Sequence, residues 1–361
     1  MNNTFYSLGL MSGTSMDGVD ASIIKSNGKD SFKTILNEYF KYNKDIYENL
    51  NTARDKISKS EDIKLLSDEL ELLEKKITLF HAEIVKKIIK KIDQEINLIG
   101  FHGQTIFHNS KEKISKQLGN GNLLSQLAKK IVVYNFRSND LKNGGEGAPL
   151  APVFHTIINK QLNNKTKLFL NIGGIANETV IEENGEFFAR DLGPGNCLID
   201  KWIRLNSNKF FDKNGSIARA GKINKIILEQ SLDLFYNNNI SKKKSYDIND
   251  FDLSFVKDLS LKDGAATLTE FTAKILSKNI SNHNIYVCGG GRKNKFLIQK
   301  IEEKINNKIK LIDDIGIDGD FVESQAFAFL AIRSYLKLPI SFPRTTGCSK
   351  PLTGGVIVKN F

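Results

Sequence analysis

Two glycine-rich turns, one in each half of the chain, constrain the fold more than any other feature of the sequence. The first turn, residues 13–18, separates apolar runs at 5–8 and 19–24. The second, residues 173–174, interrupts a strand-like segment in a similar way. Apolar runs separated by such turns predict β-hairpins. Two similar hairpins predict a duplicated fold with two phosphate-facing turns across one cleft.

The first turn carries groups suited to binding an anion. Gly13 lets backbone N–H groups approach an anion closely, and the hydroxyls of Thr14 and Ser15 add uncharged donors. Asp17 or Asp20 is placed to hold hydrated Mg²⁺ (magnesium). These features favour the terminal phosphates of a nucleotide. The alternative is an ordinary hairpin turn without a ligand, and the short motif alone leaves both interpretations open.

Strand-like runs alternate with helical patterns along the chain, which predicts an α/β protein. Apolar residues at spacings of three and four predict a helix over 62–91, with His81 beside its apolar stripe as a surface or boundary residue. A closing helix is expected over 323–338. The strand candidates, each followed by a glycine or polar turn, are 97–101, 131–136, 167–171 and 284–288. Ligands of open α/β sheets bind outside the carboxyl ends of the strands, so we expect the site there.

Composition argues against several classes of protein. The chain has 361 residues, 40% hydrophobic and 26% charged, as in an ordinary soluble enzyme of two domains. No apolar run approaches the roughly 18 residues that cross a bilayer. Residues 1–4 lack the start of a secretory signal, so we expect a cytoplasmic protein without a membrane partner. Cys197, Cys288 and Cys348 lie far apart, which indicates neither a disulfide framework nor a zinc site.

The net charge of +11 raises the question of nucleic-acid binding. The lysines are spread over the whole chain, the run 242–244 is short, and no nucleic-acid motif accompanies them. We therefore expect a solvated basic surface that favours small anionic substrates, and no nucleic-acid partner.

Three further turns carry candidate ligand groups. His102, Gln104 and Thr105 follow the first strand candidate and are of the kind that fixes sugar hydroxyls or an amide. Another of these turns, residues 289–291, holds three glycines after a buried strand, which favours close approach of a bulky ligand such as an adenosine.

Asp191 belongs to the last of these three further turns and lies at the expected mouth of a strand. The tight turn 193–195 and a helix over 197–203 follow it. A carboxylate in this position can act as a general base on water or on a hydroxyl. The alternative is that Asp191 only caps the helix or pairs with Arg190.

Competing motifs are absent from the sequence. Residues 215–223 have one residue too many for a P-loop and end in Ile223, and no Rossmann glycine pattern follows a strand. The sequence also lacks a metalloprotease His-Glu-x-x-His motif and a G-x-S-x-G nucleophile elbow. Phosphoryl transfer without a P-loop is the remaining interpretation.

Motifs along nearly the whole chain resemble those of the anhydro-N-acetylmuramic acid kinase family. They occur in the family's order, at 9–20, 102–105, 135–137, 144–150, 171–177, 191–196, 288–291 and 319–323. The resemblance implies an α/β fold with two related actin-like, ribonuclease H-like domains flanking a nucleotide cleft, as in acetate and sugar kinases, Hsp70 and actin. We expect the domains to cover 1–142 with 342–361, and 143–341.

The resemblance also implies a reaction and its site. ATP, water and 1,6-anhydro-N-acetylmuramic acid would give N-acetylmuramic acid 6-phosphate and ADP in cell-wall recycling, with Asp191 as catalytic base and Mg²⁺ on Asp17. The residues expected to bind the nucleotide are Gly13, Thr14, Ser15, Met16, Asp17, Gly18, Val19, Asp20, Gly173, Gly174, Gly289, Gly290, Gly291 and Asn294. The residues expected to bind the sugar are His102, Gln104, Thr105, Asn171, Gly193, Asn196 and Glu323.

Some positions depart from the family pattern. Asn120 and Asn135 stand where Asp is usual, Glu146 replaces a common Gln, and 246–249 differ from the usual sequence. These departures bear on substrate detail more than on reaction class. The alternatives are a kinase of the same fold that acts on an ordinary amino sugar, and a non-catalytic ATP-driven conformational protein. The resemblance further implies a homodimer.

Overall fold

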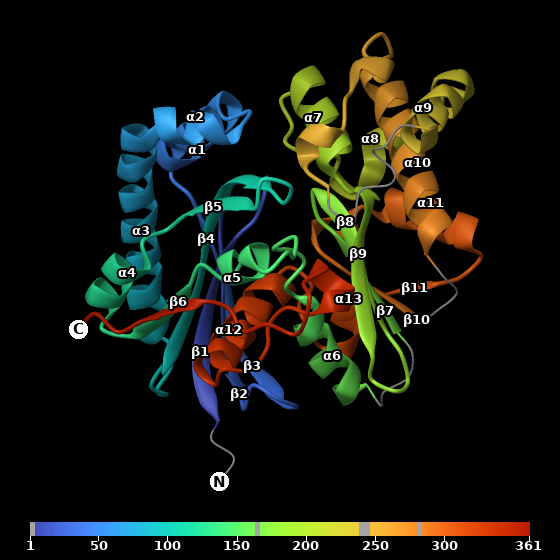
Figure 1. Cartoon of the computed structure of the whole chain (residues 1–361). Coiled ribbons are helices and arrows are strands. Elements are labelled where there is room, and N and C mark those ends of the chain that lie inside the picture. Colours follow the sequence, from blue (N-terminus) through green and yellow to red (C-terminus); the bar gives the residue numbers. More distant parts are fainter. Residues whose placement is uncertain (1–3, 163–166, 238–245, 281–283) are drawn as a thin grey trace. The chain divides into compact units, whose positions relative to one another are not determined.

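The computed structural model describes residues 4–162, 167–237, 246–280 and 284–361 (Figure 1). The chain forms two compact units. Unit 1 comprises Met1–Asn163 and Phe321–Phe361, and unit 2 comprises Asn164–Asp320. These bounds differ from the predicted domains, 1–142 with 342–361 and 143–341. Two helices cause the difference, because both α6 (Pro152–Gln161) and α12 (Val322–Tyr335) pack within unit 1.

Unit 1 is built on a seven-stranded sheet. Its strands are β1 (Phe5–Ser12), β2 (Gly18–Ser26), β3 (Phe32–Lys41), β4 (Leu98–Asn109), β5 (Ile114–Leu118), β6 (Ile131–Tyr134) and β12 (Val356–Val358). β1, β2 and β3 form an antiparallel meander, and β4 and β6 run parallel to β1 on its other side. β5 pairs with β4, and β12 pairs with β6. The first predicted hairpin is therefore confirmed.

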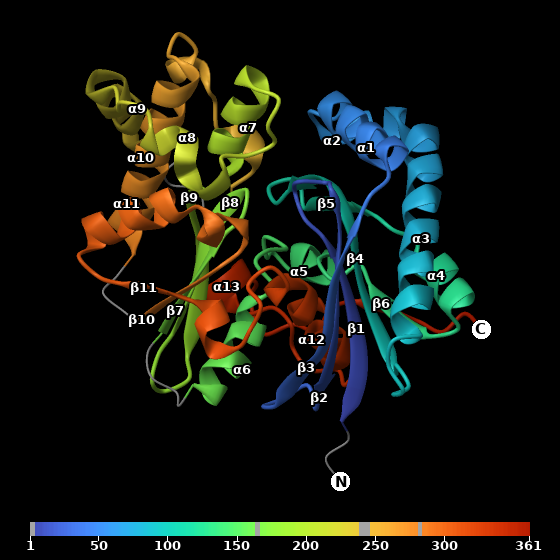
Figure 2. The ribbon, with the colours of Figure 1, turned by 180° about the vertical axis from the view of Figure 1, so that it is seen from behind.

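Helices cover both faces of this sheet. They are α1 (Lys44–Lys56), α2 (Ser60–Leu65), α3 (Ser67–Ile89), α4 (Gly121–Ala128), α5 (Ser138–Lys142), α6, α12 and α13 (Pro343–Thr346). Figures 1 and 2 show α3 and α12 on opposite faces. α12 packs directly on two glycines, since a Cβ at Gly9 would lie 1.9 Å from Ser324 O and one at Gly100 would lie 2.2 Å from Phe327 O.

Unit 2 repeats the strand arrangement of unit 1. Its sheet contains β7 (Lys167–Ile172), β8 (Ile175–Ile181), β9 (Phe187–Pro194), β10 (Asn284–Cys288) and β11 (Ile309–Leu311). β7, β8 and β9 form an antiparallel meander, and β10 and β11 lie parallel to β7 on its other side. The order β11-β10-β7-β8-β9 thus matches β6-β4-β1-β2-β3. The predicted duplicated α/β fold is confirmed.

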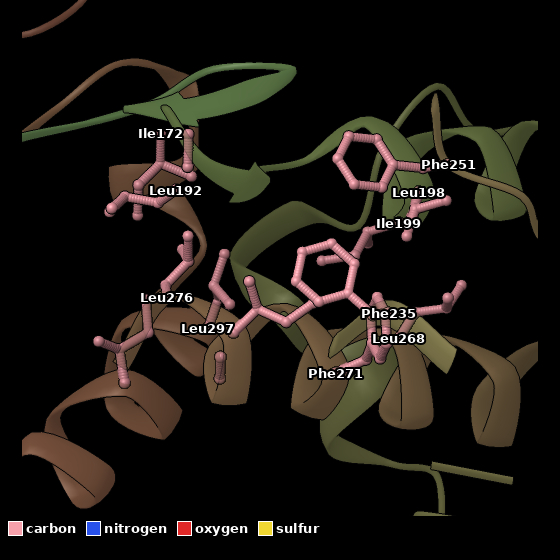
Figure 3. Close-up of a cluster of buried hydrophobic side chains, with 14 of the residues drawn as sticks. Ile172, Leu192, Leu198, Ile199, Phe235, Phe251, Leu268, Phe271, Leu276 and Leu297 are labelled. Carbon is pink, nitrogen blue, oxygen red and sulfur yellow. The ribbon is translucent and has the colours of Figure 1, made fainter. Parts of the chain in front are cut away.

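The helices of unit 2 enclose a large apolar core. They are α7 (Cys197–Asn206), α8 (Ser216–Arg219), α9 (Lys225–Asn237), α10 (Leu261–Asn279) and α11 (Lys295–Ile305), with short 3₁₀ turns that include η5 (Gly290–Lys293) and η6 (Ile312–Ile315). Figure 3 shows Phe235 of α9 and Phe271 of α10 within this core, and their ring centroids lie 6.1 Å apart. The core gives the site-bearing ends of the strands a rigid base.

Several local predictions need correction. The helix expected over 62–91 is interrupted at Leu66, between α2 and α3. His81 is not at the surface: it is fully buried, and its ring centroid lies 4.8 Å from that of Phe101. The strand expected over 131–136 ends at Tyr134, because Asn135 adopts a left-handed conformation with φ 54°.

The strand expected over 97–101 also needs correction, because β4 continues to Asn109. His102, Gln104 and Thr105 therefore lie in a strand rather than in a turn. The helix expected over 323–338 is confirmed as α12 with slightly different ends. Among the described residues, no helix has both the length and the apolar character needed to span a membrane.

Candidate functional site

The β1–β2 turn in unit 1 is held in shape by its neighbours. Met16 N–H donates to Gly13 O at 3.2 Å, and the buried Met16 side chain anchors the turn in the core. Gln104 Nε2 of β4 donates to Gly13 O at 2.9 Å. On the other side, Tyr42 N–H donates to Asp17 O at 2.9 Å. The turn is therefore fixed before any ligand arrives.

The outer face of the same turn presents polar groups to solvent. Thr14, Ser15 and Asp17 are exposed, and Ser15 Oγ donates to Asp17 Oδ1. A Cβ at Gly13 would have no neighbouring atom within 4 Å, so a ligand has room to approach its backbone. Gly18 differs, because a Cβ there would lie 2.5 Å from Phe40 O. Gly18, like the buried Val19 beside it, serves packing.

His102 lies buried in β4 with both ring nitrogens bonded within unit 1. Nδ1–H donates to Gly103 O at 2.8 Å, and Nε2 accepts from Arg137 Nη2 at 2.9 Å. A carbonyl can only accept and a guanidinium can only donate, so these two bonds fix the neutral tautomer. Burial and the neighbouring Arg137 charge hold the pKa of His102 well below its usual value. His102 thus orients Arg137.

Gln104 and Thr105 follow His102 in β4. Gln104 is fully buried and its Oε1 has no hydrogen-bond partner, which is costly unless a ligand satisfies it. Thr105 Oγ1 accepts from Gln117 Nε2 of β5 at 3.2 Å. These two side chains remain candidates for contact with a polar ligand.

Arg137 is a functional candidate that lies in the motif 135–137 but is absent from the site residues predicted from the sequence. Nη1 donates to Gly147 O at 2.8 Å, and the buried Nε has no hydrogen-bond partner. Burial lowers the pKa of Arg137, whereas the charges of Glu323 and Asp140 act in the opposite direction. The arginine in Asn135-Phe-Arg137 is the signal that identifies it. Glu323, a predicted sugar ligand, lies half-buried in the first turn of α12.

The loop that follows Arg137 is fixed by Asp140. Its carboxylate accepts from Gly147 N–H at 2.7 Å and from Thr346 Oγ1 at 2.6 Å. Glu146 N–H in turn donates to Thr346 O at 2.8 Å. The Gly-rich motif at 144–150 thus forms a braced loop beside Arg137.

In unit 2, the β7–β8 turn binds the loop before α7 through its backbone. Gly173 O accepts from Asn196 N–H at 2.8 Å, and Gly174 O accepts from Gly195 N–H at 2.9 Å. A Cβ at Gly195 would lie 2.3 Å from Gly173 O, so only glycine allows this approach. The second predicted hairpin and the turn 193–195 therefore form one structure.

The triglycine turn after β10 lies beside the end of β7, where Cys288 pairs with Asn171. Gly289 has φ 77°, and a Cβ there would lie 2.3 Å from Asn171 Oδ1. A Cβ at Gly291 would lie 2.2 Å from Ile172 Cγ2. Gly290, in contrast, is exposed, and the nearest atom to its Cβ position is Asn196 Nδ2 at 4.0 Å. Gly290 is therefore the member of the turn that a ligand can approach.

Asp191 lies within β9, which ends at Pro194, rather than at the mouth of the strand. It pairs in register with Asn177 of β8, which pairs with Asn171 of β7. Cross-strand partners share a face of the sheet, so the three side chains form one polar row. Tyr246 N–H donates to Asp191 Oδ2 at 2.9 Å, and burial together with the Asp191 charge raises the pKa of Tyr246 to about 12.

Two other predicted ligands have structural roles. Asn294 caps α11 by accepting from Leu297 N–H at 3.0 Å. Gly193 leaves room for α10, because a Cβ there would lie 2.7 Å from Ile275 Cγ2.

Two departures from the family pattern also have a local explanation. Asn120 caps α4 by accepting from Leu123 N–H at 2.9 Å, and Asn135 adopts a left-handed conformation that Asn tolerates well.

The described residues contain no cluster of three or more His, Cys, Asp or Glu side chains that could hold a metal ion. Mg²⁺ bound with a nucleotide needs fewer protein ligands, since one or two carboxylates, the phosphates and water complete its coordination shell. The exposed Asp17 in the β1–β2 turn fits that requirement.

Comparison with known proteins identifies the family. The family model described as "Anhydro-N-acetylmuramic acid kinase" matches residues 5–360. A protein of that name from Pelagibacter ubique (strain HTCC1062) is 53% identical over 375 residues, which cover 100% of both chains. Its namesake from Agrobacterium fabrum is 36% identical, with 98% of each chain covered. A solved ROK family glucokinase from Streptomyces griseus aligns with 90% of this chain and 99% of its own at 12% identity and a TM-score of 0.40, too low to support an argument. The match of the family model and the two relatives confirm the resemblance read from the sequence motifs, and the chain belongs to the anhydro-N-acetylmuramic acid kinase family.

Proposed function

We propose that the chain is an ATP-dependent kinase that opens 1,6-anhydro-N-acetylmuramic acid with water and phosphorylates O6. The products are N-acetylmuramic acid 6-phosphate and ADP, and the activity serves cell-wall recycling. One observation in unit 2 supports this reaction most directly. Asp191 pairs in register with Asn177, and Asn177 pairs with Asn171, which lies beside the triglycine turn. The expected base and the expected nucleoside site therefore share one sheet.

Asp191 acts as the general base in this proposal. Its carboxylate takes a proton from water, the water oxygen bonds to the anomeric carbon, and the bond from that carbon to O6 breaks. The freed O6 then bonds to the γ-phosphorus of ATP as the bond to the β-phosphate oxygen breaks. The backbone N–H of Tyr246 orients the Asp191 carboxylate for the proton transfer.

The β1–β2 turn binds the phosphates of ATP, with its exposed hydroxyls as donors. Asp17 is the carboxylate that would hold Mg²⁺, which supplies positive charge to the phosphates when bound. The open space at Gly13 and the exposure of Thr14 and Ser15 support this assignment. In unit 2, the exposed Gly290 is the point of contact with the nucleoside.

Sugar recognition is assigned to the polar groups that the resemblance implies. In unit 1 these are Gln104, Thr105 and Glu323, with His102 acting through Arg137 because its own nitrogens are bonded. In unit 2 they are Asn171 and Asn196. A homodimer in the cytoplasm belongs to the same proposal, and light scattering of the purified protein tests the dimer.

Product analysis in heavy-oxygen water tests the reaction. The protein is incubated with ATP, Mg²⁺ and 1,6-anhydro-N-acetylmuramic acid. A 6-phosphorylated sugar with label on the anomeric oxygen supports coupled ring opening. Phosphorylation of an ordinary amino sugar but not of the anhydro sugar supports the alternative kinase. ATP hydrolysis without any sugar product would indicate an ATP-driven conformational protein.

A further inference from the structure

Arg292 directly follows the triglycine turn and has no part in the chemistry described above. Its side chain is 5% exposed, which is unusual for an arginine unless it is paired. Three aspartates of the segment Asp313–Asp320 approach it, and Lys293 contacts one of them. We call Arg292, Lys293 and these three aspartates the Arg292 cluster.

The guanidinium is held in a defined geometry. Nε donates to Asp313 Oδ2 at 2.8 Å and Nη2 donates to Asp313 Oδ1 at 3.0 Å, a two-pronged contact that lysine cannot reproduce. Nη1 donates to Asp320 Oδ1 at 2.5 Å and to Gly289 O at 3.3 Å. One side chain therefore joins the first glycine of the turn to both ends of the segment.

The backbone of the segment adds to this connection. Gly289 N–H donates to Gly319 O at 3.2 Å. A Cβ at Gly319 would lie 2.4 Å from Arg292 Nε, so the guanidinium packs closely against this glycine. Residues 289–292 and 313–320 thus form one interlocked structure at the end of β10.

Electrostatics favours the same arrangement. Burial alone would lower the pKa of Arg292, but the hydrogen bonds that it donates to Asp313 and Asp320, together with the charges of these carboxylates, outweigh burial and raise the pKa. The hydrogen bond from Arg292 in turn lowers the pKa of Asp313. Arg292 and Lys293 offset carboxylates that would otherwise repel an anionic ligand at the turn.

We propose that Arg292 is a positioning residue of the nucleotide site, which holds the triglycine turn in its binding shape by clamping it to Asp313 and Asp320. This inference rests on the proposed function, in which Gly290 contacts the nucleoside. The clamp acts before ATP binds, so it lowers the cost of ordering the turn. Asp320 is also the last residue of unit 2, so the clamp fixes the turn to the point where the chain leaves that unit.

Three variants test the clamp in the full-length protein. Arg292→Lys keeps the charge but loses the two-pronged geometry, and Arg292→Gln loses both. Gly319→Ala displaces the guanidinium without altering its charge. The control is Lys304→Gln, which breaks another partly buried ion pair of unit 2, with Glu270 at 2.5 Å, away from the turn. The measurements are the Kd for a non-hydrolysable ATP analogue, KM and kcat for both substrates, and the thermal unfolding midpoint.

We expect Arg292→Lys and Gly319→Ala to raise the Kd and KM for the nucleotide about tenfold, because a charge-assisted contact is lost or displaced. The KM for the sugar should stay unchanged. Arg292→Gln should bind the nucleotide more weakly than Arg292→Lys does. Lys304→Gln should bind ATP normally, although it should lose a similar amount of thermal stability to the Arg292 variants. A wild-type nucleotide affinity in both Arg292→Lys and Gly319→Ala overturns the positioning role.

A separate variant tests the assumption beneath this inference. Gly290→Val adds bulk at an exposed position where a Cβ has a neighbouring protein atom only at 4.0 Å, so it acts on the ligand rather than on the fold. Weaker nucleotide binding in this variant supports the triglycine site. Unchanged binding overturns that site, and with it the proposed role of Gly290, independently of what the Arg292 variants show.

Discussion

Gly9 of β1 and Gly100 of β4 are direct neighbours in the sheet of unit 1, and α12 rests on both of them. The helix can approach this closely because neither residue has a side chain. Each glycine faces a backbone carbonyl of α12, Ser324 O and Phe327 O respectively, which cannot rotate away as a side chain can.

Gly100→Ala should therefore destabilise the protein by about 3 kcal/mol, the upper range for overpacking a core. A matched control is Gly13→Ala, whose Cβ would meet nothing within 4 Å and should change stability by less than about 0.5 kcal/mol. Urea unfolding at neutral pH measures both. Equal stability of the two variants would show that α12 can shift away from β4.

Asp191→Asn should retain ATP binding and lose roughly 10³-fold in kcat, because the amide cannot accept the proton from water. The Tyr246 N–H can still donate to the amide oxygen, so the local fold should persist. Steady-state kinetics and calorimetric titration with an ATP analogue measure the two effects. Near-normal turnover would remove Asp191 as the base.

Gly13→Val should weaken ATP binding at least tenfold by blocking backbone approach, an effect on the order of 1.4 kcal/mol or more. The open space at Gly13 makes this a test of the ligand rather than of folding. The Kd for ATP with Mg²⁺ measures the effect, and the unfolding midpoint serves as the control. An unchanged Kd would mean that the β1–β2 turn does not bind the phosphates.

Because His81 is buried, we expect the free energy of unfolding to fall in acid. Burial lowers the pKa of His81 from 6.5 to about 4, so below pH 6.5 the unfolded chain binds the proton that the folded chain excludes. The stabilisation is complete above pH 6.5 and is lost as the pH falls towards 4. Between pH 7 and pH 5 the loss is about 2 kcal/mol for one such residue.

His81→Phe should remove this share of the pH dependence. His108 and His155 have similarly lowered pKa values of about 4, so a pH dependence from those residues should remain. Urea unfolding of wild type and variant at pH 7 and pH 5 gives the difference directly. The same loss of stability in both proteins would show that His81 does not exclude the proton when folded.

The sequence predicts the repeated elements of this fold well because their signals are local. Both hairpins arise from apolar runs and a glycine turn, and β10 has the ends expected for it. The predicted surface or boundary position of His81 is wrong, because the apolar stripe of α3 does not reveal that β4 brings Phe101 against this residue. The sequence predicts a turn at His102 because the glycines on both sides of it resemble a strand end, whereas the structure shows that Gly100 allows contact with α12.

The site is predicted less completely than the fold, since its supporting contacts join distant parts of the chain. Asp191 and the glycine turns stand in recognisable motifs. The importance of Arg137 depends on His102 and Gly147, and that of Arg292 depends on Asp313 and Asp320. No local pattern marks these partners. Asn294 shows a further difficulty, because asparagine is typical both of helix caps and of ligand sites, and the structure shows that this residue caps α11.

The division of unit 1 between the two ends of the chain affects how the protein is made. β1 and β4 emerge from the ribosome early, whereas α12, which covers Gly9 and Gly100, belongs to the segment Phe321–Phe361. Throughout synthesis of unit 2, the sheet of unit 1 therefore lacks the helix that covers one of its faces. Unit 2 is continuous in sequence and can complete its core first. The unit whose translation begins first is thus the last to have its whole sequence available for folding.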